Sequence, residues 1–417
     1  MRKMLFCWPM VLLIFGLEPW ARAQEAWTWE KVRDRFELNN PTLQASRLNI
    51  DESKALEVTA HLRPNPNLAI TGDQIDPFGG PPHGSWAYFE PVASVSYLFE
   101  RDHKRGLRFE SAQKATAIAT SNRDDTERNL LFNLRGAFVD TLQAKAVLDV
   151  AKDNLTYYDK LLGVSRERLN AGDIAQIDLD RLELQRVQYE SDLQTAVVNL
   201  RTAKIQLLML LNDRTPIDQF DLVGTFDFNS QTPSLDDVRQ AALAARPDLR
   251  AAMQSVDKAR TDHKLAIANG STDPTVSFDV GRNPPIDAYF GVSVSIPLRV
   301  FDRNQGEKRR TELDIDRNQK LLDAAQAQVF SDVDSAYETL RSNVVLLEPY
   351  KQKYLAQAVK VRDTVAFAYQ HGGASLLDFL NAQSDYRSVQ LNYVNLVGSY
   401  LTAASQLNLA VGREVVQ

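Results

Sequence analysis

The chain has 417 residues, of which 44% are hydrophobic and 24% are charged, so it can bury the core of one or two domains and is not a disordered chain. Its formal net charge is −6 and its basic residues are scattered, which argues against a nucleic-acid-binding protein. The only cysteine, Cys7, lies in a segment expected to be removed. We therefore expect no disulfide, no thiolate nucleophile and no cysteine-ligated metal.

The first residues have the composition of a secretory signal peptide, predicted at 1–23. Arg2 and Lys3 precede an apolar run at 4–17, and the small-residue motif that ends at Ala23 is typical of a cleavage site. An uncleaved membrane anchor is the alternative, but a spanning helix needs about 20 apolar residues and this run is shorter. No later stretch is apolar enough to span a membrane as a helix. Insertion in a membrane would therefore have to use strands.

The rest of the chain is predicted to contain an internal repeat. Residues 28–43 match 234–249 at an offset of 206, and beyond the predicted strands the offset is 200. The pairs at this second offset include Gly106 with Gly306, Gly172 with Gly372, Asp178 with Asp378, and Leu207 with Leu407. Chance similarity of two helical segments is the alternative. The predicted organisation is a first repeat (24–212), a linker (213–233) and a second repeat (234–417), each repeat beginning with a short helix and a second helix.

Each repeat is predicted to contain a β-hairpin, at 67–99 and at 274–300. In the last strand the apolar residues Phe290, Val292, Val294 and Ile296 alternate with Tyr289, Gly291, Ser293 and Ser295. The first hairpin alternates in the same way, with Leu68, Ile70, Ala93, Val95 and Tyr97 on one side. A sheet with one apolar face and one polar, water-facing face is typical of a membrane barrel, and a soluble sandwich is the alternative.

Each β-hairpin is followed by a predicted helical hairpin, at 106–212 and at 306–412. Apolar positions spaced alternately four and three residues apart form a heptad seam in both return arms, at Tyr189, Leu193, Ala196, Leu200, Ala203 and Leu207, and at Val389, Tyr393, Leu396, Tyr400, Ala403 and Leu407. The first arm contains no proline and would reach about 95 Å at 1.5 Å per residue. Such helices are expected to pack side by side as a long bundle or tube.

The number of strands predicts that the chain assembles. Four strands cannot close a membrane barrel, because an open edge in lipid leaves backbone groups unpaired. A dimer would supply eight strands and a trimer twelve. Ser94, Ser96, Ser293 and Ser295 are small and are expected to face the interior, which favours the wider twelve-stranded barrel with a water-filled bore.

These features together resemble the TolC-type outer-membrane efflux proteins. The resemblance is carried by the signal peptide, the duplicated order of helix, strand hairpin and helical hairpin, and the Gly-x5-Asp motif at Gly172 and Gly372. It implies a mainly α fold with membrane β structure, in which a homotrimer forms a twelve-stranded outer-membrane barrel and a periplasmic helical barrel. The linker 213–233 would lie in the mixed region between them.

The same resemblance implies a passive duct of a tripartite efflux system. Its partners would be a periplasmic adaptor (membrane fusion) protein, an inner-membrane pump that is driven by protons, and outer-membrane lipid. The exported substrates would be metal ions or drugs, and the metal-efflux branch is the preferred interpretation.

The turn of each helical hairpin is predicted at glycines. Gly172, Gly372 and Gly373 tolerate the positive φ that a helix end needs when the chain reverses. Asp173 and Ser375 follow the turns directly and are predicted to cap the returning helices. These five residues also mark the hairpin tips, where the resemblance implies docking of the adaptor.

Asp178 and Asp378 are predicted on the first turns of the returning helices. In a trimer each would form a ring of three carboxylates, which attracts cations and repels anions. The resemblance implies that Asp378 narrows the periplasmic mouth of the channel. Asn381 stands where the family's best-known member has a second aspartate, so a second acidic ring is not implied. The alternative is that Asp378 only lies on a solvated helix start.

Two other classes of protein, an enzyme and a periplasmic scaffold, fit the sequence less well. The histidines, His61, His83, His103, His263 and His371, have no metal-ligand spacing, and no nucleophile or phosphate-binding motif is present, so neither an enzyme nor a cofactor is predicted. The aspartates near 173–180 do not have the spacing of a calcium loop. A periplasmic coiled-coil scaffold or adaptor without a membrane barrel would explain the heptads but not the duplicated strands.

Overall fold

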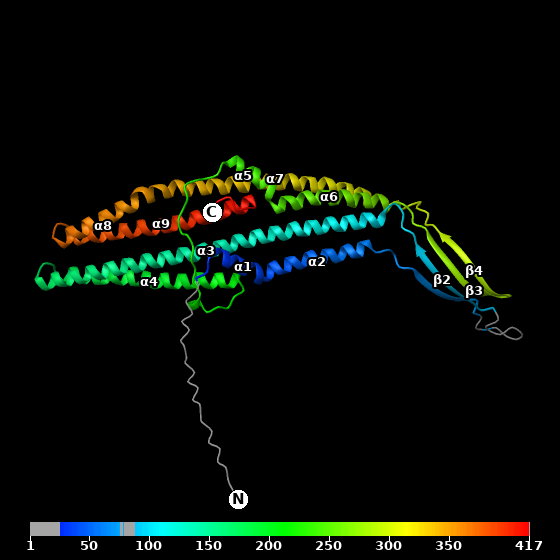
Figure 1. Cartoon of the computed structure of the whole chain (residues 1–417), viewed down its shortest axis with the longest axis horizontal. Helices are drawn as coiled ribbons and strands as arrows, with labels where there is room; N and C mark the ends of the chain where they lie inside the picture. The colour runs from blue at the N-terminus through cyan, green and yellow to red at the C-terminus, as the bar shows by residue number, and fades with distance from the viewer. Residues whose placement is uncertain (1–25, 76–77, 79–87, 417) are drawn as a thin grey trace, which may run out of the picture.

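The structure is a computed structural model that describes residues 26–75, 78 and 88–416. The predicted signal peptide at 1–23, and most of residues 76–86 in the first predicted β-hairpin, lie outside the described residues. Figure 1 shows an elongated molecule, with two helical hairpins at one end and a small sheet at the other. The predicted mainly helical, duplicated chain with four strands is confirmed.

The same order of elements occurs twice along the chain. In the first half the elements are α1 (Trp29–Asn39), α2 (Pro41–His61), β1 (Asn67–Asp73), β2 (Glu90–Leu98), α3 (Lys104–Ala171) and α4 (Gln176–Leu210). In the second half they are α5 (Leu235–Ala245), α6 (Pro247–Ala268), β3 (Thr275–Asn283), β4 (Ile286–Ser295), α7 (Gln305–Pro349), α8 (Leu355–Gln370) and α9 (Leu376–Val411). A short 3₁₀ turn, η1 (Ile217–Gln219), lies in the segment between the halves.

The sheet is a single antiparallel meander in the order β1-β2-β3-β4. Its register aligns apolar residues in rows across all four strands, as in the row Leu68, Val95, Phe278 and Val292. The opposite face carries the row Asn67, Ser96, Ser277 and Ser293. The predicted alternation is therefore confirmed, and most of the apolar face is exposed on the single chain.

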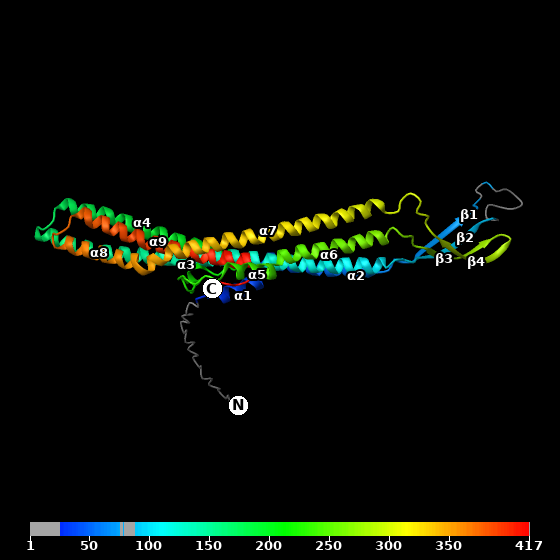
Figure 2. The same cartoon turned by 90° about the horizontal axis from the view of Figure 1, so that it is seen from above.

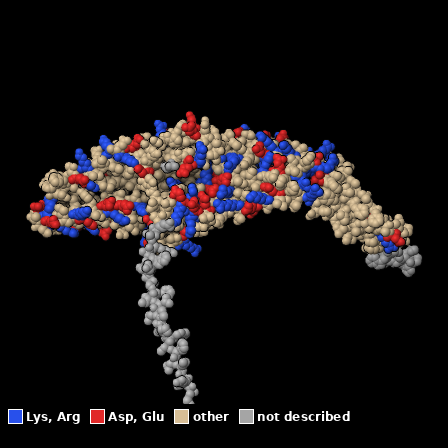
Figure 3. All heavy atoms as spheres, in the orientation of Figure 1, with Lys and Arg blue, Asp and Glu red and all other residues tan. Residues whose placement is uncertain are grey.

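Charged side chains are sparse in the sheet and include Asp73, Glu90, Asp279, Arg282 and Asp287. In the face of the molecule drawn in Figure 3, Lys, Arg, Asp and Glu are spread over the helical part, whereas the strand end is almost free of them. None of the helices in the described ranges combines the length and the apolar character needed to cross a membrane.

The two helical hairpins lie side by side. One hairpin is formed by α3 and α4, the other by α7 and α8 together with α9, and both views show them running to the same end of the molecule (Figures 1 and 2). The α3 helix can extend over 68 residues because no proline or glycine cluster interrupts it. It contacts both α4 and α9, so it joins the two hairpins.

The second outgoing arm is not one helix. Pro349 ends α7, and the next five residues form a π-helical turn, η2 (Tyr350–Tyr354), before α8 begins. Proline lacks the backbone N–H that would bond to the preceding turn, so the helix widens locally. Lys351 in this turn donates to Asp227 of the linker at 2.7 Å, which fastens the linker to the widened segment.

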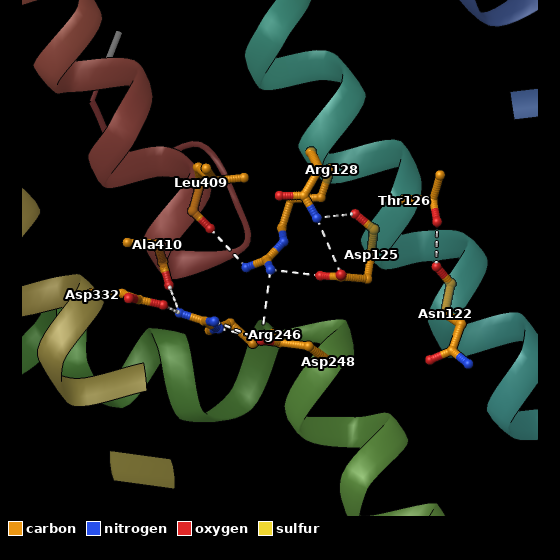
Figure 4. Close-up of polar contacts among 10 residues, drawn as sticks. Asn122, Asp125, Thr126, Arg128, Arg246, Asp248, Asp332, Leu409 and Ala410 are labelled. Atoms are coloured by element: carbon orange, nitrogen blue, oxygen red, sulfur yellow. Dashed lines mark hydrogen bonds and ion pairs between the residues drawn. The ribbon is translucent and has the colours of Figure 1, made fainter. Parts of the chain in front are cut away.

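A buried ionic network joins the halves where α6 begins and α9 ends (Figure 4). Arg246, only 5% exposed, donates to Asp248 at 2.6 Å, to Asp332 of α7 at 2.8 Å and to the carbonyl oxygen of Ala410 at 3.2 Å. The neighbouring Arg128 of α3 donates to Asp125 and to the Leu409 carbonyl. The carbonyls of Leu409 and Ala410 in the last turn of α9 thus accept from arginines, and the Leu409 carbonyl also accepts from the Gly412 N–H at 3.2 Å.

Candidate functional site at the hairpin tips

Both hairpins reverse at a glycine with a left-handed backbone. Gly172 has φ of 83° and Gly372 has φ of 76°, as predicted. In each turn the following residue closes the helix, since Asp173 N–H donates to the Arg168 carbonyl at 2.8 Å and Gly373 N–H donates to the Ala368 carbonyl at 2.7 Å. The prediction of a positive φ at Gly373 is wrong, because one left-handed residue is enough to reverse each helix.

The two returning helices are capped differently. Ser375 is the N-cap of α9, and its hydroxyl accepts from the Asp378 N–H at 3.1 Å while Asp378 Oδ2 accepts from the Ser375 N–H at 3.1 Å. This reciprocal pair is a capping box. The predicted cap at Asp173 is wrong. The N-cap of α4 is Ala175, two residues later, which has no side-chain acceptor.

Asp178 and Asp378 occupy equivalent positions on the first turns of α4 and α9, as predicted. Hydrogen bonds from the Ser375 hydroxyl and backbone N–H hold the pKa of Asp378 below its usual range, so this exposed carboxylate is ionised and fixed in place. Asp178 is partly buried, and its charge adds to the effect of burial in raising the pKa of Tyr369 on the other hairpin. Asn381 is exposed, one turn beyond Asp378.

An arginine and an aromatic pair join the two hairpins at the tips. Tyr369 of α8 stacks on the fully buried Phe379 of α9, with 5.2 Å between the ring centroids. Arg168 of α3 donates to the Tyr369 carbonyl at 2.8 Å and lies 5.3 Å from the centroid of the Tyr369 ring. Tyr158 and Leu182 of the first hairpin complete the cluster. Sequence reasoning missed Arg168 and Tyr369.

Farther from the tips a second contact ties the hairpins. Arg387 of α9 pairs with Asp192 of α4 at 2.8 Å and lies 5.7 Å from the centroid of the Tyr189 ring. The heptad seam predicted Tyr189 as a core residue, and it is buried. The partnership of Arg387 and Asp192 has no signal in the sequence, because it depends on how one hairpin lies against the other.

The tips also present apolar side chains to solvent. Ile177 of α4 and Leu377 of α9, at equivalent positions beside the two aspartates, are 57% and 67% exposed on the single chain. Phe367 of α8 is exposed too. Across residues 26–75, 78 and 88–416, no group of three or more His, Cys, Asp or Glu side chains is placed to hold a metal ion. The tips therefore combine fixed carboxylates with apolar surface.

Comparisons with known proteins relate this architecture to one family. Residues 238–413 match the family model for outer membrane efflux proteins. The chain is 21% identical to the cobalt-zinc-cadmium resistance protein CzcC of Cupriavidus metallidurans, over 90% of this chain and 87% of that protein. It is 20% identical to the outer membrane protein TolC of Escherichia coli, over 96% of this chain and 85% of that protein.

The second half of the chain thus matches the outer membrane efflux protein family, and the chain is similar to CzcC and TolC along most of its length. A crystal structure of CusC shares the fold, with a TM-score of 0.78 at 17% identity over 92% of each chain. That of VceC from Vibrio cholerae has a TM-score of 0.75 at 15% identity, over 93% of this chain and 97% of the other. The matches to outer membrane proteins support the predicted location in the outer membrane, with helices that extend into the periplasm.

Proposed function

We propose that this outer membrane efflux protein works as a passive trimeric duct. The observation that supports it best is the sheet, which has an exposed apolar face, a face of small polar residues and two open edges. Within the described residues, β1 and β4 each have a partner strand on one side only. In lipid both edges must be paired, and pairing β1 of one copy with β4 of the next in a ring satisfies them.

Three copies would give twelve strands. The polar rows then face the bore, where Ser96, Ser277, Ser293 and Gly291 leave room for water, and the apolar rows face lipid. The hairpins of three copies would form the periplasmic tube. We propose the two repeats and the linker, with the bounds predicted from the sequence, as the units of this assembly.

The hairpin tips form the periplasmic mouth in this proposal. Asp378 from three copies makes a ring of ionised carboxylates, Asp178 lies on the equivalent turn, and Asn381 extends the polar surface by one turn. A periplasmic adaptor would dock on the tip turns at Gly172, Asp173, Gly372, Gly373 and Ser375. Exposed Ile177 and Leu377 beside them supply apolar contact area.

In this proposal the partner proteins determine the exported substrate and supply the energy. A duct has no site that consumes energy, so we propose that an inner-membrane pump, driven by protons, loads it through the adaptor, and that the chain itself catalyses no reaction. The relative CzcC is named for resistance to cobalt, zinc and cadmium. Divalent metal ions are therefore the proposed cargo, and drugs are the alternative. An acidic mouth favours the passage of cations.

The oligomeric mass of the protein in detergent tests the assembly. Light scattering is expected to give three chains per particle, and membranes washed with carbonate are expected to retain the protein. A monomer released by carbonate would overturn the duct and support a periplasmic coiled-coil scaffold instead.

Conductance across a planar bilayer tests the acidic mouth. Asp378→Asn removes three charges from the trimer while keeping the side-chain oxygen that accepts from the Ser375 N–H, so cation selectivity is expected to fall with the fold intact. Asp173→Asn is the matched control, since Asp173 is an exposed tip carboxylate outside the capping box. Equal selectivity in wild type and Asp378→Asn would show that the Asp378 ring does not constrict the channel.

A further inference from the structure

A cavity of about 370 Å³ lies far from the tips, between α1, α3, α9 and the chain after Gly412. One side is apolar and includes Trp29, Leu131 and Phe132. The other side contains Arg128 and the backbone around Leu409, which hydrogen bond to each other at 2.8 Å (Figure 4). The cavity therefore has one wall that is fixed by paired groups and one that offers a flat aromatic surface.

In the described part of the chain, Arg135 is a cation of this cavity that has no directly bonded counter-charge. Its guanidinium lies 4.5 Å from the centroid of the Trp29 ring and 5.8 Å from that of Phe138. Within the described residues it makes no ion pair, and the nearest influences of opposite charge are Glu30 and Glu414. Burial lowers the pKa of Arg135, as expected for a cation removed from water without a bound anion.

Several other charged groups of the cavity have partners, whereas Arg413 and Glu414, which are exposed, lie next to each other at its rim. Asp124 pairs with Arg250 at 2.5 Å and Glu127 pairs with Arg123 at 2.8 Å. Arg128 has Asp125 as its partner. Glu30 is hydrogen bonded to Thr28 at the start of α1, and it acts on Arg135 through its charge without forming an ion pair with it. Arg413 and Glu414 carry opposite charges at the exposed rim, so the partly buried Arg135 is the cation that remains to bind an anion inside the cavity.

We propose that this cavity is a binding site for an organic anion with an apolar body. The acidic group, a carboxylate, sulfonate or phosphate, would take the two-pronged hydrogen bond that a guanidinium offers. The apolar body would lie against Phe132 and Leu131, beside the Trp29 ring on which Arg135 is stacked. This site is independent of the duct, because it requires neither the tip carboxylates nor the sheet.

Equilibrium dialysis of naphthalene-2-sulfonate against the assembled full-length protein in lipid nanodiscs tests the proposal, with empty nanodiscs as the blank. Saturable binding of one molecule per chain is expected. Arg135→Gln is expected to weaken it at least tenfold, Arg135→Lys to weaken it less, and Trp29→Leu to weaken it as well. Arg341→Gln, which removes an exposed arginine of α7, is the matched control and should bind as the wild type does.

The charge preference of the site can be tested with the wild-type protein alone. Naphthylmethylammonium has the same ring with the opposite charge and is expected not to bind. Equal binding of the two probes, binding that Arg135→Gln leaves unchanged, or no saturable binding of the sulfonate would each overturn the proposal. The last result is expected if a neighbouring copy fills the cavity in the assembly. If Arg135→Gln fails to assemble, Arg135→Lys and Trp29→Leu are compared with the wild type in the same assay.

Discussion

Arg246→Gln is expected to destabilise the protein more than the loss of any exposed arginine. The substitution leaves Asp248, Asp332 and the Ala410 carbonyl without their donor in a site where Arg246 is 5% exposed. Removing one partner of a fully buried ion pair costs about 3–5 kcal/mol. Both aspartates keep about a third of their side-chain surface in water, so the low end, about 3 kcal/mol, applies.

For a chain of this size that loss corresponds to about 4 °C in the unfolding midpoint, measured by circular dichroism of the assembled protein. Arg239→Gln is the matched control. Arg239 makes a two-pronged pair with Asp334 across α5 and α7, at 2.8 Å for both bonds, but it is solvent-accessible, so its loss is expected to cost less than about 1 kcal/mol. Equal midpoint shifts for the two variants would refute the claim that burial makes the Arg246 network important.

The same network predicts a pH dependence. Burial alone would raise the pKa of Asp248, but the hydrogen bonds and the charge of Arg246 outweigh it and hold the pKa below its usual range. A depressed carboxyl pKa contributes stability above the ordinary value of about 4, and this contribution is lost as the pH falls through the folded-state pKa. The stability gap between wild type and Arg246→Gln should therefore narrow below about pH 4. A gap that is constant from pH 7 to pH 3 would contradict this.

Three further substitutions test the tips. Gly372→Ala places a side chain at φ of 76° and is expected to cost about 1 kcal/mol, seen as roughly fivefold faster hydrogen exchange in the turn, whereas Gly373→Ala should change little. Phe379→Ala opens a cavity in the fully buried tip cluster and should cost about 3–5 kcal/mol in thermal unfolding, against less than about 1 kcal/mol for the exposed neighbour in Leu377→Ala. Asn381→Asp adds a carboxylate one turn beyond the proposed ring and should raise cation selectivity in planar bilayers; unchanged selectivity would place Asn381 outside the bore.

Local geometry could be predicted from the sequence because its signals are local. The strand alternation fixed which residues share a face, and the register in the structure keeps Leu68, Val95 and Phe278 in one row. The glycine at each turn was identified because only a residue that tolerates positive φ can follow a helix that reverses. The N-cap predicted at Asp173 lies two residues before the observed N-cap, Ala175. The start of the helix depends on how the turn closes and not on the position of the nearest side-chain acceptor.

The interruption of the second outgoing arm was also missed. Pro349 lies inside a long apolar-periodic segment, and a proline there predicts a kink or a break. Whether the chain kinks, ends or widens into a π turn depends on what packs around it. Here Asp227 of the linker bonds to Lys351, and the linker's Phe228 packs on Tyr400, so residues remote in sequence favour the widened form. No periodicity within the arm contains that information.

The internal repeat explains which functional contacts escaped prediction. Residues that are alike in the two halves serve the geometry of each hairpin, as Gly172 and Gly372 do. The contacts between the halves join unlike residues, one from each repeat. They therefore occur at positions where the two repeats differ in sequence. Arg168 meets Tyr369, whereas their counterparts are Ala368 and Leu169.

The ion pair between Arg387 and Asp192 follows the same rule, since its counterparts are Val187 and Asn392. Residues that are identical at equivalent positions of the two repeats therefore indicate the turns, but they do not indicate the contacts that hold one hairpin against the other. In a duplicated chain of this kind, contacts between repeats should be sought at positions that differ between the repeats. The best candidates are residues that are charged or aromatic in one repeat only.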